Sequence, residues 1–130
     1  MSTVRLYTTP SDVRPCQLDE IADGRARNFV LQMRNGRFHG FVVRRNDAVH
    51  GYVDQCPHAG LPLAQKLDAY LTPDGSLIVC SWHGALFTIE GGTCVGGPCS
   101  GQRLAGWPVL AADGWIKTGS KPVTQRSNQE

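Results

Sequence analysis

Residues 54–63 read DQCPHAGLPL, and this stretch places a cysteine and a histidine, Cys56 and His58, one residue apart. A second pair stands in residues 79–87, VCSWHGALF, where two residues separate Cys80 from His83. Between His58 and Cys80 lie 21 residues. Two thiolates and two imidazoles are enough to hold a metal centre, so the sequence predicts that both loops meet at one site.

Zinc is one metal that accepts two sulfur and two nitrogen ligands. The usual structural zinc pattern puts its two cysteines in one knuckle and its two histidines on a helix. Here each loop supplies one cysteine and one histidine, which disfavours a structural zinc module. That module remains an alternative at this stage.

The sequence on both sides of the two loops has the pattern of short strands. Apolar residues recur with a period of two, and turn-forming residues separate the runs. With 15 Gly and 8 Pro there is little room for long helices, although residues 17–22 could form a short helical turn. We expect an all-β domain of about eight to ten short strands. The turns are expected at residues 34–36, 46–47, 73–75, 90–92 and 113–114, and frayed tails up to about Thr9 and from about Ser120.

Length and charge narrow the functional classes. A chain of 130 residues forms one domain, and its net charge of +2 gives no reason to expect a nucleic-acid or membrane partner. The first 15 residues hold no apolar run of signal-peptide length, and no stretch is long and apolar enough to span a bilayer. We therefore expect a cytoplasmic protein.

The double motif, CPHAG followed by CSWHGALF, resembles the Rieske [2Fe-2S] iron-sulfur proteins, whose loops read C-x-H and C-x-x-H. The resemblance implies that Cys56 and Cys80 bind one iron of the cluster as thiolates, and that His58 and His83 bind the other as imidazoles. It also implies an antiparallel β-sandwich or barrel-like base domain. A small cluster-binding subdomain, about residues 54–101 of a single 1–130 domain, is inserted into this base.

Further residues around the cluster follow from the same resemblance. They are Gly60, Leu61, Trp82, Gly84, Ala85, Phe87 and Pro98. High-potential relatives carry a disulfide-forming cysteine where Leu61 and Trp82 stand, and hydroxyl groups where Ala85 and Phe87 stand. Because this chain has no such hydroxyl donors to sulfur, we expect a low reduction potential, on the order of −150 mV.

These departures resemble the soluble Rieske-type ferredoxins of bacterial aromatic-ring dioxygenase systems. The resemblance implies a one-electron carrier, not itself an enzyme, that takes electrons from a flavin reductase and passes them to a terminal ring-hydroxylating oxygenase. The mononuclear iron of an oxygenase would need two further histidines and a carboxylate. Only His39 and His50 remain outside the motif, and a chain of 130 residues cannot house the additional domain. A small Rieske subunit or redox sensor of another oxidoreductase, such as a nitrite-reductase-like complex, is the alternative function.

The partners are expected to dock transiently at the exposed histidine tip. The apolar collar around that tip would consist of Pro57, Ala59, Leu61, Trp82 and Pro98. The stretch 61–75 between the motifs has a helix-like apolar period and is expected to form a short elaboration. Cys94 and Cys99 have four residues between them in a glycine-rich turn, so a local disulfide is one alternative. Buried free thiols are favoured over it, because disulfides are uncommon in a reducing compartment. Cys16 is expected to be a buried or half-exposed residue near the first strand.

Overall fold

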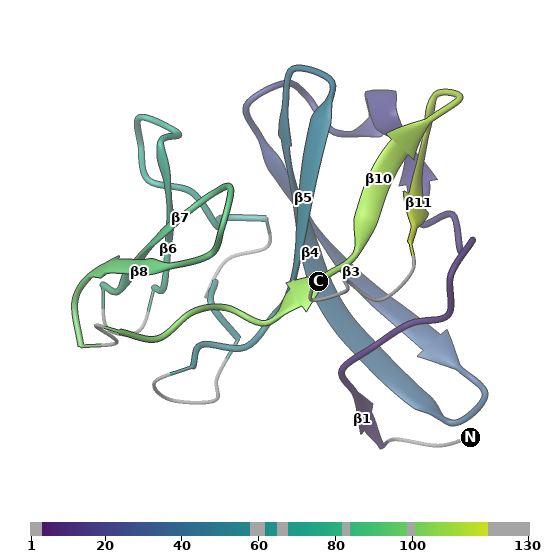
Figure 1. Cartoon of the computed structure of the whole chain (residues 1–130), viewed down its shortest axis with the longest axis horizontal. Coiled ribbons are helices and arrows are strands. Elements are labelled where there is room, and N and C mark those ends of the chain that lie inside the picture. The colour runs from purple at the N-terminus through teal and green to yellow at the C-terminus, as the bar shows by residue number, and fades with distance from the viewer. Residues whose placement is uncertain (1–3, 58–61, 65–67, 82–83, 99–100, 120–130) are drawn as a thin grey trace, which may run out of the picture.

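The computed structural model describes residues 4–57, 62–64, 68–81, 84–98 and 101–119. Strands dominate this part of the chain, as expected, and the short turn after residue 17 is a 3-10 helix (Figure 1). In chain order the elements are β1 (Arg5–Leu6), β2 (Cys16–Gln17), η1 (Leu18–Glu20), β3 (Ala26–Met33), β4 (Gly36–Arg45), β5 (Ala48–Val53), β6 (Leu77–Val79), β7 (Leu86–Thr88), β8 (Cys94–Gly96), β9 (Gly106–Trp107), β10 (Val109–Ala112) and β11 (Trp115–Thr118).

The antiparallel strands β3, β4 and β5 form the centre of the molecule (Figure 1). Their hairpins are tight, with Met33 opposite Gly36 and Arg45 opposite Ala48. These turns fall where Arg-Asn-Gly and Asn-Asp were expected to form them. Asn46 adopts a φ of 56°, a left-handed conformation that asparagine tolerates better than most residues. The prediction of the central hairpins is confirmed.

Strand β4 is buried on both faces, which explains its continuous apolar run. Phe38 and Val42 belong to one hydrophobic core cluster, whereas Phe41 and Val43 belong to a second. Alternate side chains of a strand point to opposite faces of the sheet. Strand β4 therefore separates two cores, and each core serves a different part of the molecule.

The first core joins the central sheet to the three-stranded sheet β10–β11–β2. Its largest side chain, Trp107, contacts the rings of Phe29 and Phe38 at centroid distances of 5.8 and 4.7 Å. A Cβ at Gly40 would lie 2.9 Å from Cε3 of Trp107, so glycine is the residue that lets the indole approach the sheet. The buried members are Cys16, Ile21, Phe29, Phe38, Val42, Val53, Trp107 and Ile116.

The N-terminal segment is more ordered than expected. Arg5–Leu6 form β1, which pairs in parallel with β4, and Trp107 Nε1 donates to Thr9 Oγ1 over 2.8 Å. The expectation of a frayed tail up to Thr9 was wrong, and the described part of the chain holds eleven strands where eight to ten were expected. A two-residue strand is too short to show a period, and its partner strand lies 32 residues further along the sequence.

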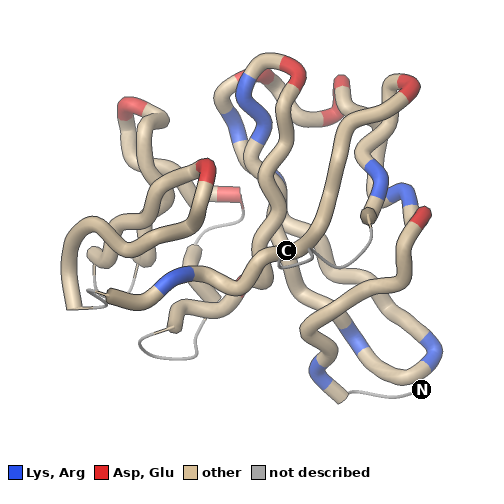
Figure 2. The backbone as a smooth tube through the Cα atoms, in the orientation of Figure 1, with Lys and Arg blue, Asp and Glu red and all other residues tan. Residues whose placement is uncertain are grey.

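The second core lies under the smaller sheet β6–β7–β8, which stands beside the central strands in Figure 1. Its buried members are Phe41, Val43, Tyr52, Cys56, Leu63, Tyr70, Ile78, Cys80, Ala85, Phe87, Ile89, Cys94 and Leu104. In the described part of the chain, charged positions of both signs lie at several hairpin ends and along the N-terminal segment (Figure 2). In the part of the chain that the structure describes, no helix is long and apolar enough to cross a membrane.

Candidate metal centre

The two Cys/His motifs follow strand ends that the fold brings together. The first motif begins after β5 ends at Val53, and the second occupies the connection between β6 and β7. The side chains of Cys56 and Cys80 are both 0% exposed and belong to the same core cluster. Neither thiol is in a disulfide. The fold thus buries two potential thiolate ligands in one apolar setting.

The second loop is closed by its own backbone. Cys80 donates its N–H to the carbonyl of Ala85 over 2.8 Å, and Gly84 donates to the carbonyl of Cys80 over 2.9 Å. Gly84 has a φ of 70°, a conformation that glycine adopts without steric cost. This turn positions the Cys80 side chain against the core and leaves Gly84 exposed.

The buried residue Leu63 connects the two loops. Its N–H donates to Oδ1 of Asp54 over 2.9 Å, and its carbonyl accepts from the N–H of Ser81 over 2.7 Å. Asp54 lies two residues before Cys56, and Ser81 directly follows Cys80. Hydrogen bonds therefore connect Asp54, just before the first motif, to Leu63, just after it. They also connect Leu63 to Ser81 in the second motif.

A third segment, around Gly97, packs against the second loop. A Cβ at Gly97 would lie 2.8 Å from Cα of Ala85 and 3.3 Å from the carbonyl oxygen of Gly84. Gly97 also has a φ of 88°. The close approach of the two backbones places Gly97, the residue before Pro98, directly against Gly84 and Ala85 of the second motif.

A family model described as the Rieske [2Fe-2S] domain matches residues 12–116. The chain belongs to the Rieske [2Fe-2S] domain family. The cofactor of this family is a Rieske-type cluster, and two buried thiols on adjoining loops suit its cysteine ligands.

The Rieske domain is similar to one curated protein, apoptosis-inducing factor 3 of Homo sapiens, with 28% identity over 95 residues. The match covers 71% of this chain but only 14% of that protein, so the chain corresponds to a small part of its length.

Solved structures share the fold. The ferredoxin of carbazole 1,9a-dioxygenase from Nocardioides aromaticivorans IC177 has a TM-score of 0.66 at 21% identity, covering 86% of this chain and all of that one. A chain in a complex of reduced oxygenase and oxidized ferredoxin of carbazole 1,9a-dioxygenase has a TM-score of 0.65 at 23% identity, with coverage of 84% and 93%. A structure described as an NADPH nitrite reductase small subunit has a TM-score of 0.60 at 15% identity, with coverage of 85% and 100%.

Several of the predicted residues lie outside the described part of the chain. They are His58, Gly60, Leu61, Trp82 and His83. Among the described residues, Ala85 and Phe87 are 0% exposed, and Pro98 is exposed. The described ranges contain no group of three or more His, Cys, Asp or Glu side chains that could hold a metal ion. The two expected histidine ligands, His58 and His83, lie outside these ranges.

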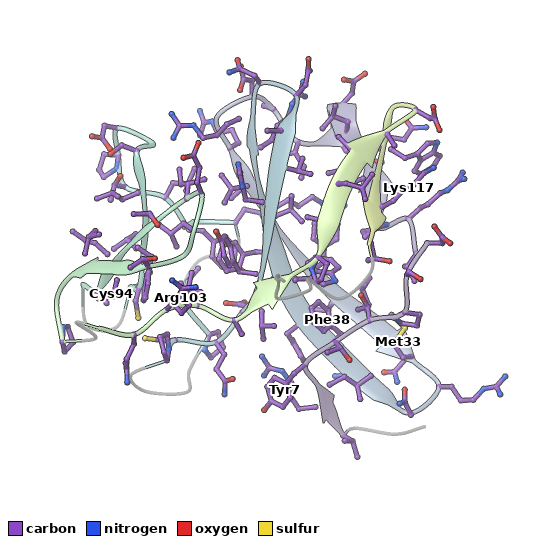
Figure 3. All side chains as sticks on the ribbon, in the orientation of Figure 1. Tyr7, Met33, Phe38, Cys94, Arg103 and Lys117 are labelled. Carbon is purple, nitrogen blue, oxygen red and sulfur yellow. The ribbon has the colours of Figure 1, made fainter. Side chains whose placement is uncertain are left out.

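Cys94 corrects one expectation about the Rieske domain. Cys94 is disulfide-bonded, whereas it was expected to be a buried thiol. It lies on β8 of the smaller sheet (Figure 3) and is 8% exposed. The expectation rested on the compartment, which sets how often disulfides form on average and does not decide any one thiol. Cys99 lies outside the described residues, and Cys16 is a buried thiol in β2, as expected.

The 61–75 stretch shows no helix in its described residues, 62–64 and 68–75. Leu63 and Tyr70 are buried in the second core, which accounts for much of its apolar period. Leu71 forms an isolated antiparallel bridge with Ile78, and Thr72 donates its N–H to the carbonyl of Leu77. This end of the stretch therefore extends the smaller sheet.

Sequence reasoning missed a polar cluster next to the site. Asp54 is only 5% exposed, and its Oδ2 accepts from the Tyr70 hydroxyl at 2.9 Å and from Asn28 Nδ2 at 3.3 Å. Burial, with the nearby charge of Asp54, raises the pKa of Tyr70, so its hydroxyl stays protonated. One signal was present in the sequence: Asp54 directly follows the apolar residues Tyr52 and Val53 and precedes a predicted ligand by two residues.

Proposed function

We propose that this Rieske domain is a one-electron carrier of the cytoplasm. The observation that carries the proposal is the burial of Cys56 and Cys80 in one apolar cluster, on loops joined through Leu63 and Ser81. This arrangement suits a small metal cluster held between two loops. Residues 54–101, within a single domain, form the proposed cluster-binding subdomain.

The four motif residues have separate roles in this proposal. Cys56 and Cys80 would bind one iron as thiolates, and His58 and His83 would bind the other as neutral imidazoles. When bound, the cluster supplies reversible one-electron chemistry. Ala85 and Phe87 surround the cysteine side with apolar groups, and neither offers a hydroxyl to the sulfur atoms. A low reduction potential follows.

The proposed partners are a flavin reductase and a terminal ring-hydroxylating oxygenase. The reduced flavin gives up one electron to the carrier, and the carrier passes the same electron to the oxygenase, so each pair of electrons needs two cycles. The ferredoxins of carbazole 1,9a-dioxygenase, which share the fold, support this choice. The proposed docking surface is the histidine tip with its collar, Pro57, Ala59, Leu61, Trp82 and Pro98; such electron-transfer contacts are small and transient.

A second candidate is a small Rieske subunit of another oxidoreductase. The fold shared with the nitrite reductase small subunit favours it. In that case the chain would remain bound to its enzyme through purification, whereas a diffusing carrier would separate from its partners. Co-purification from the native host distinguishes the two candidates.

Rapid mixing tests the carrier role. The chemically reduced protein is mixed with a ring-hydroxylating oxygenase, and the cluster absorbance is followed; the oxidised protein is mixed in parallel with NADH and a flavin reductase. We expect one electron to pass in each experiment. Trp82→Ala should slow the transfer to the oxygenase while leaving the cluster spectrum intact, and unchanged rates with this variant would remove the collar from the proposal.

A further inference from the structure

Asp54 is a buried carboxylate whose every hydrogen-bonding group is engaged. Its Oδ1 accepts from Leu63 N–H, and its Oδ2 accepts from Tyr70 and Asn28. Its backbone N–H donates to the carbonyl of His39, and its own carbonyl accepts from Arg5 Nη2 over 3.0 Å. Buried charges are costly unless they are hydrogen-bonded in this way. So complete a set of partners indicates a fixed position for Asp54.

The partners of Asp54 come from distant parts of the chain. Asn28 lies on β3, Leu63 follows the first ligand loop, and Tyr70 belongs to the stretch between the two motifs. Tyr70 is itself fixed, because its ring stacks on Phe41 of β4 at 4.2 Å with an angle of 6° between the planes. Asn28 Nδ2 donates to the Tyr70 hydroxyl over 2.7 Å and ties that hydroxyl to the central sheet.

The Asp54 carboxylate also reaches the second ligand loop. Leu63, which donates to the carboxylate, accepts from Ser81 through its carbonyl. A displacement of Asp54 would therefore move the entry and exit of the first loop, and also the residue that follows Cys80. No other carboxylate in the described part of the chain is buried.

We propose that Asp54, held by Tyr70 and Asn28, is the positioning residue of both cluster-binding loops, and that its buried negative charge lowers the reduction potential of the cluster. This inference rests on the proposed ligands Cys56 and His58. An added electron increases the negative charge of the cluster, and a carboxylate two residues from a ligand opposes that addition through a medium of low dielectric constant. The Asp54 charge thus acts in the same direction as the missing hydroxyl donors.

Two substitutions separate the positioning role from the charge. Asp54→Asn removes the charge but keeps an oxygen that can accept from Leu63 N–H. Asp54→Ala removes both. Asp74 provides the matched control, because its carboxylate accepts hydrogen bonds from Thr72 and Ser76 in an exposed turn of the same region.

The charge is tested by redox titration of the cluster-loaded protein. In Asp54→Asn we expect the reduction equilibrium to shift at least tenfold toward the reduced cluster, which is about 59 mV for one electron. Asp74→Asn should leave the midpoint unchanged. A midpoint of Asp54→Asn that equals that of Asp74→Asn would overturn the charge effect.

The positioning role is tested by the rate at which iron passes to a chelator and by hydrogen exchange at the Leu63 amide. In Asp54→Ala we expect both rates to rise at least tenfold over those in Asp74→Ala, and Asp54→Asn should restore slow iron loss. Equal rates in Asp54→Ala and Asp74→Ala would refute the positioning role. If Asp54→Ala does not assemble a cluster, hydrogen exchange at the Leu63 amide is measured in Asp54→Asn instead. Protection of this amide near the wild-type level supports the positioning role, and loss of its protection contradicts that role.

A failure of the underlying ligand assignment would look different. It would appear as a Cys56→Ser protein that keeps a Rieske-type spectrum, whatever the Asp54 variants do. If Cys56→Ser abolishes that spectrum, the ligand assignment holds, and the Asp54 variants then test the present inference.

Discussion

Cys56 and Cys80 are fully buried, and both are predicted metal ligands. Bound iron would hold both side chains as thiolates and would neutralise their charge. The apolar surroundings of both thiols therefore fit a loaded site better than a reactive one.

Substitution of either thiol should abolish the cluster. In Cys56→Ser and Cys80→Ser we expect iron and sulfide to fall from about two of each per chain to near zero. Cys16→Ser is the matched control, because Cys16 is also a buried thiol but belongs to the other core cluster. Iron and sulfide analysis of the purified variants is the measurement, and a Cys80→Ser protein with full iron content would exclude Cys80 as a ligand.

The four ligands stay a prediction, which the sequence allows because each motif is local, with its cysteine and histidine a few residues apart. The Asp54 cluster could not be predicted, because its members are joined only by the fold. Asn28 and Tyr70 are separated by 42 residues, and no spacing rule connects them. The disulfide at Cys94 was ranked below a free thiol because a general preference of the reducing compartment was applied to a single residue.

The hairpins are the elements that the sequence predicts best. At residues 113–114, Asp113 and Gly114 have φ values of 56° and 79°, and both residue types tolerate this conformation in two-residue turns. Such turns fix the register of their strands, as in the pairing of Ala112 with Trp115. The β1 strand was not predictable, because it is two residues long and its partner strand lies 32 residues further along the sequence. The bridge at Leu71 is a single residue pair, too short to show a period.

The Gly97 segment gives a prediction at the scale of elements. Gly97→Ala would place a Cβ 2.8 Å from Cα of Ala85, whereas the same change at Gly101, with a similar φ of 85°, meets nothing within 4 Å. Both variants bear the cost of a left-handed alanine, but only Gly97→Ala adds a steric clash. We expect Gly97→Ala to be less stable than Gly101→Ala by about 1–3 kcal/mol.

Chemical denaturation of the two variants measures this difference. The rate of iron release to a chelator provides a second readout, because the clash would displace the backbone of the second ligand loop. Equal stability of the two variants would show that the Gly97 segment shifts to accommodate the added Cβ without loss of stability. In that case the segment does not constrain the second loop.

At the scale of the whole molecule, β4 couples the first core to the second core, which lies under the smaller sheet. On the side of the second core, Phe41 lies between Tyr52 and Tyr70, at ring-centroid distances of 5.7 and 4.2 Å. This division of one strand between two cores was visible in the sequence only as a continuous apolar run. Which residue serves which core depends on the neighbouring sheets, and the sequence does not specify that.

Alkaline pH should destabilise the protein through these buried tyrosines. Burial, with the charge of Glu90 adding to it, raises the pKa of Tyr52 to about 12 from its ordinary value of 10. Between these values the unfolded chain has released the phenolic proton and the folded chain still holds it. The free energy of unfolding therefore falls as pH rises from about 10 to 12.

Thermal unfolding between pH 9 and pH 11.5 checks this dependence. Tyr52→Phe should unfold at a lower temperature at neutral pH, because it loses the hydrogen bond to the carbonyl of Ile89, but its decline with pH should be shallower. Parallel curves for wild type and Tyr52→Phe would exclude Tyr52 as the source.

A redox titration followed by electron paramagnetic resonance tests the central claim most directly, because it reports the cluster type and its potential together. We predict a Rieske-type signal in the reduced protein, distinct from that of an all-cysteine cluster, and a midpoint on the order of −150 mV. A colourless protein that contains zinc without iron or sulfide, a signal of the all-cysteine type, or a midpoint above zero would contradict the account.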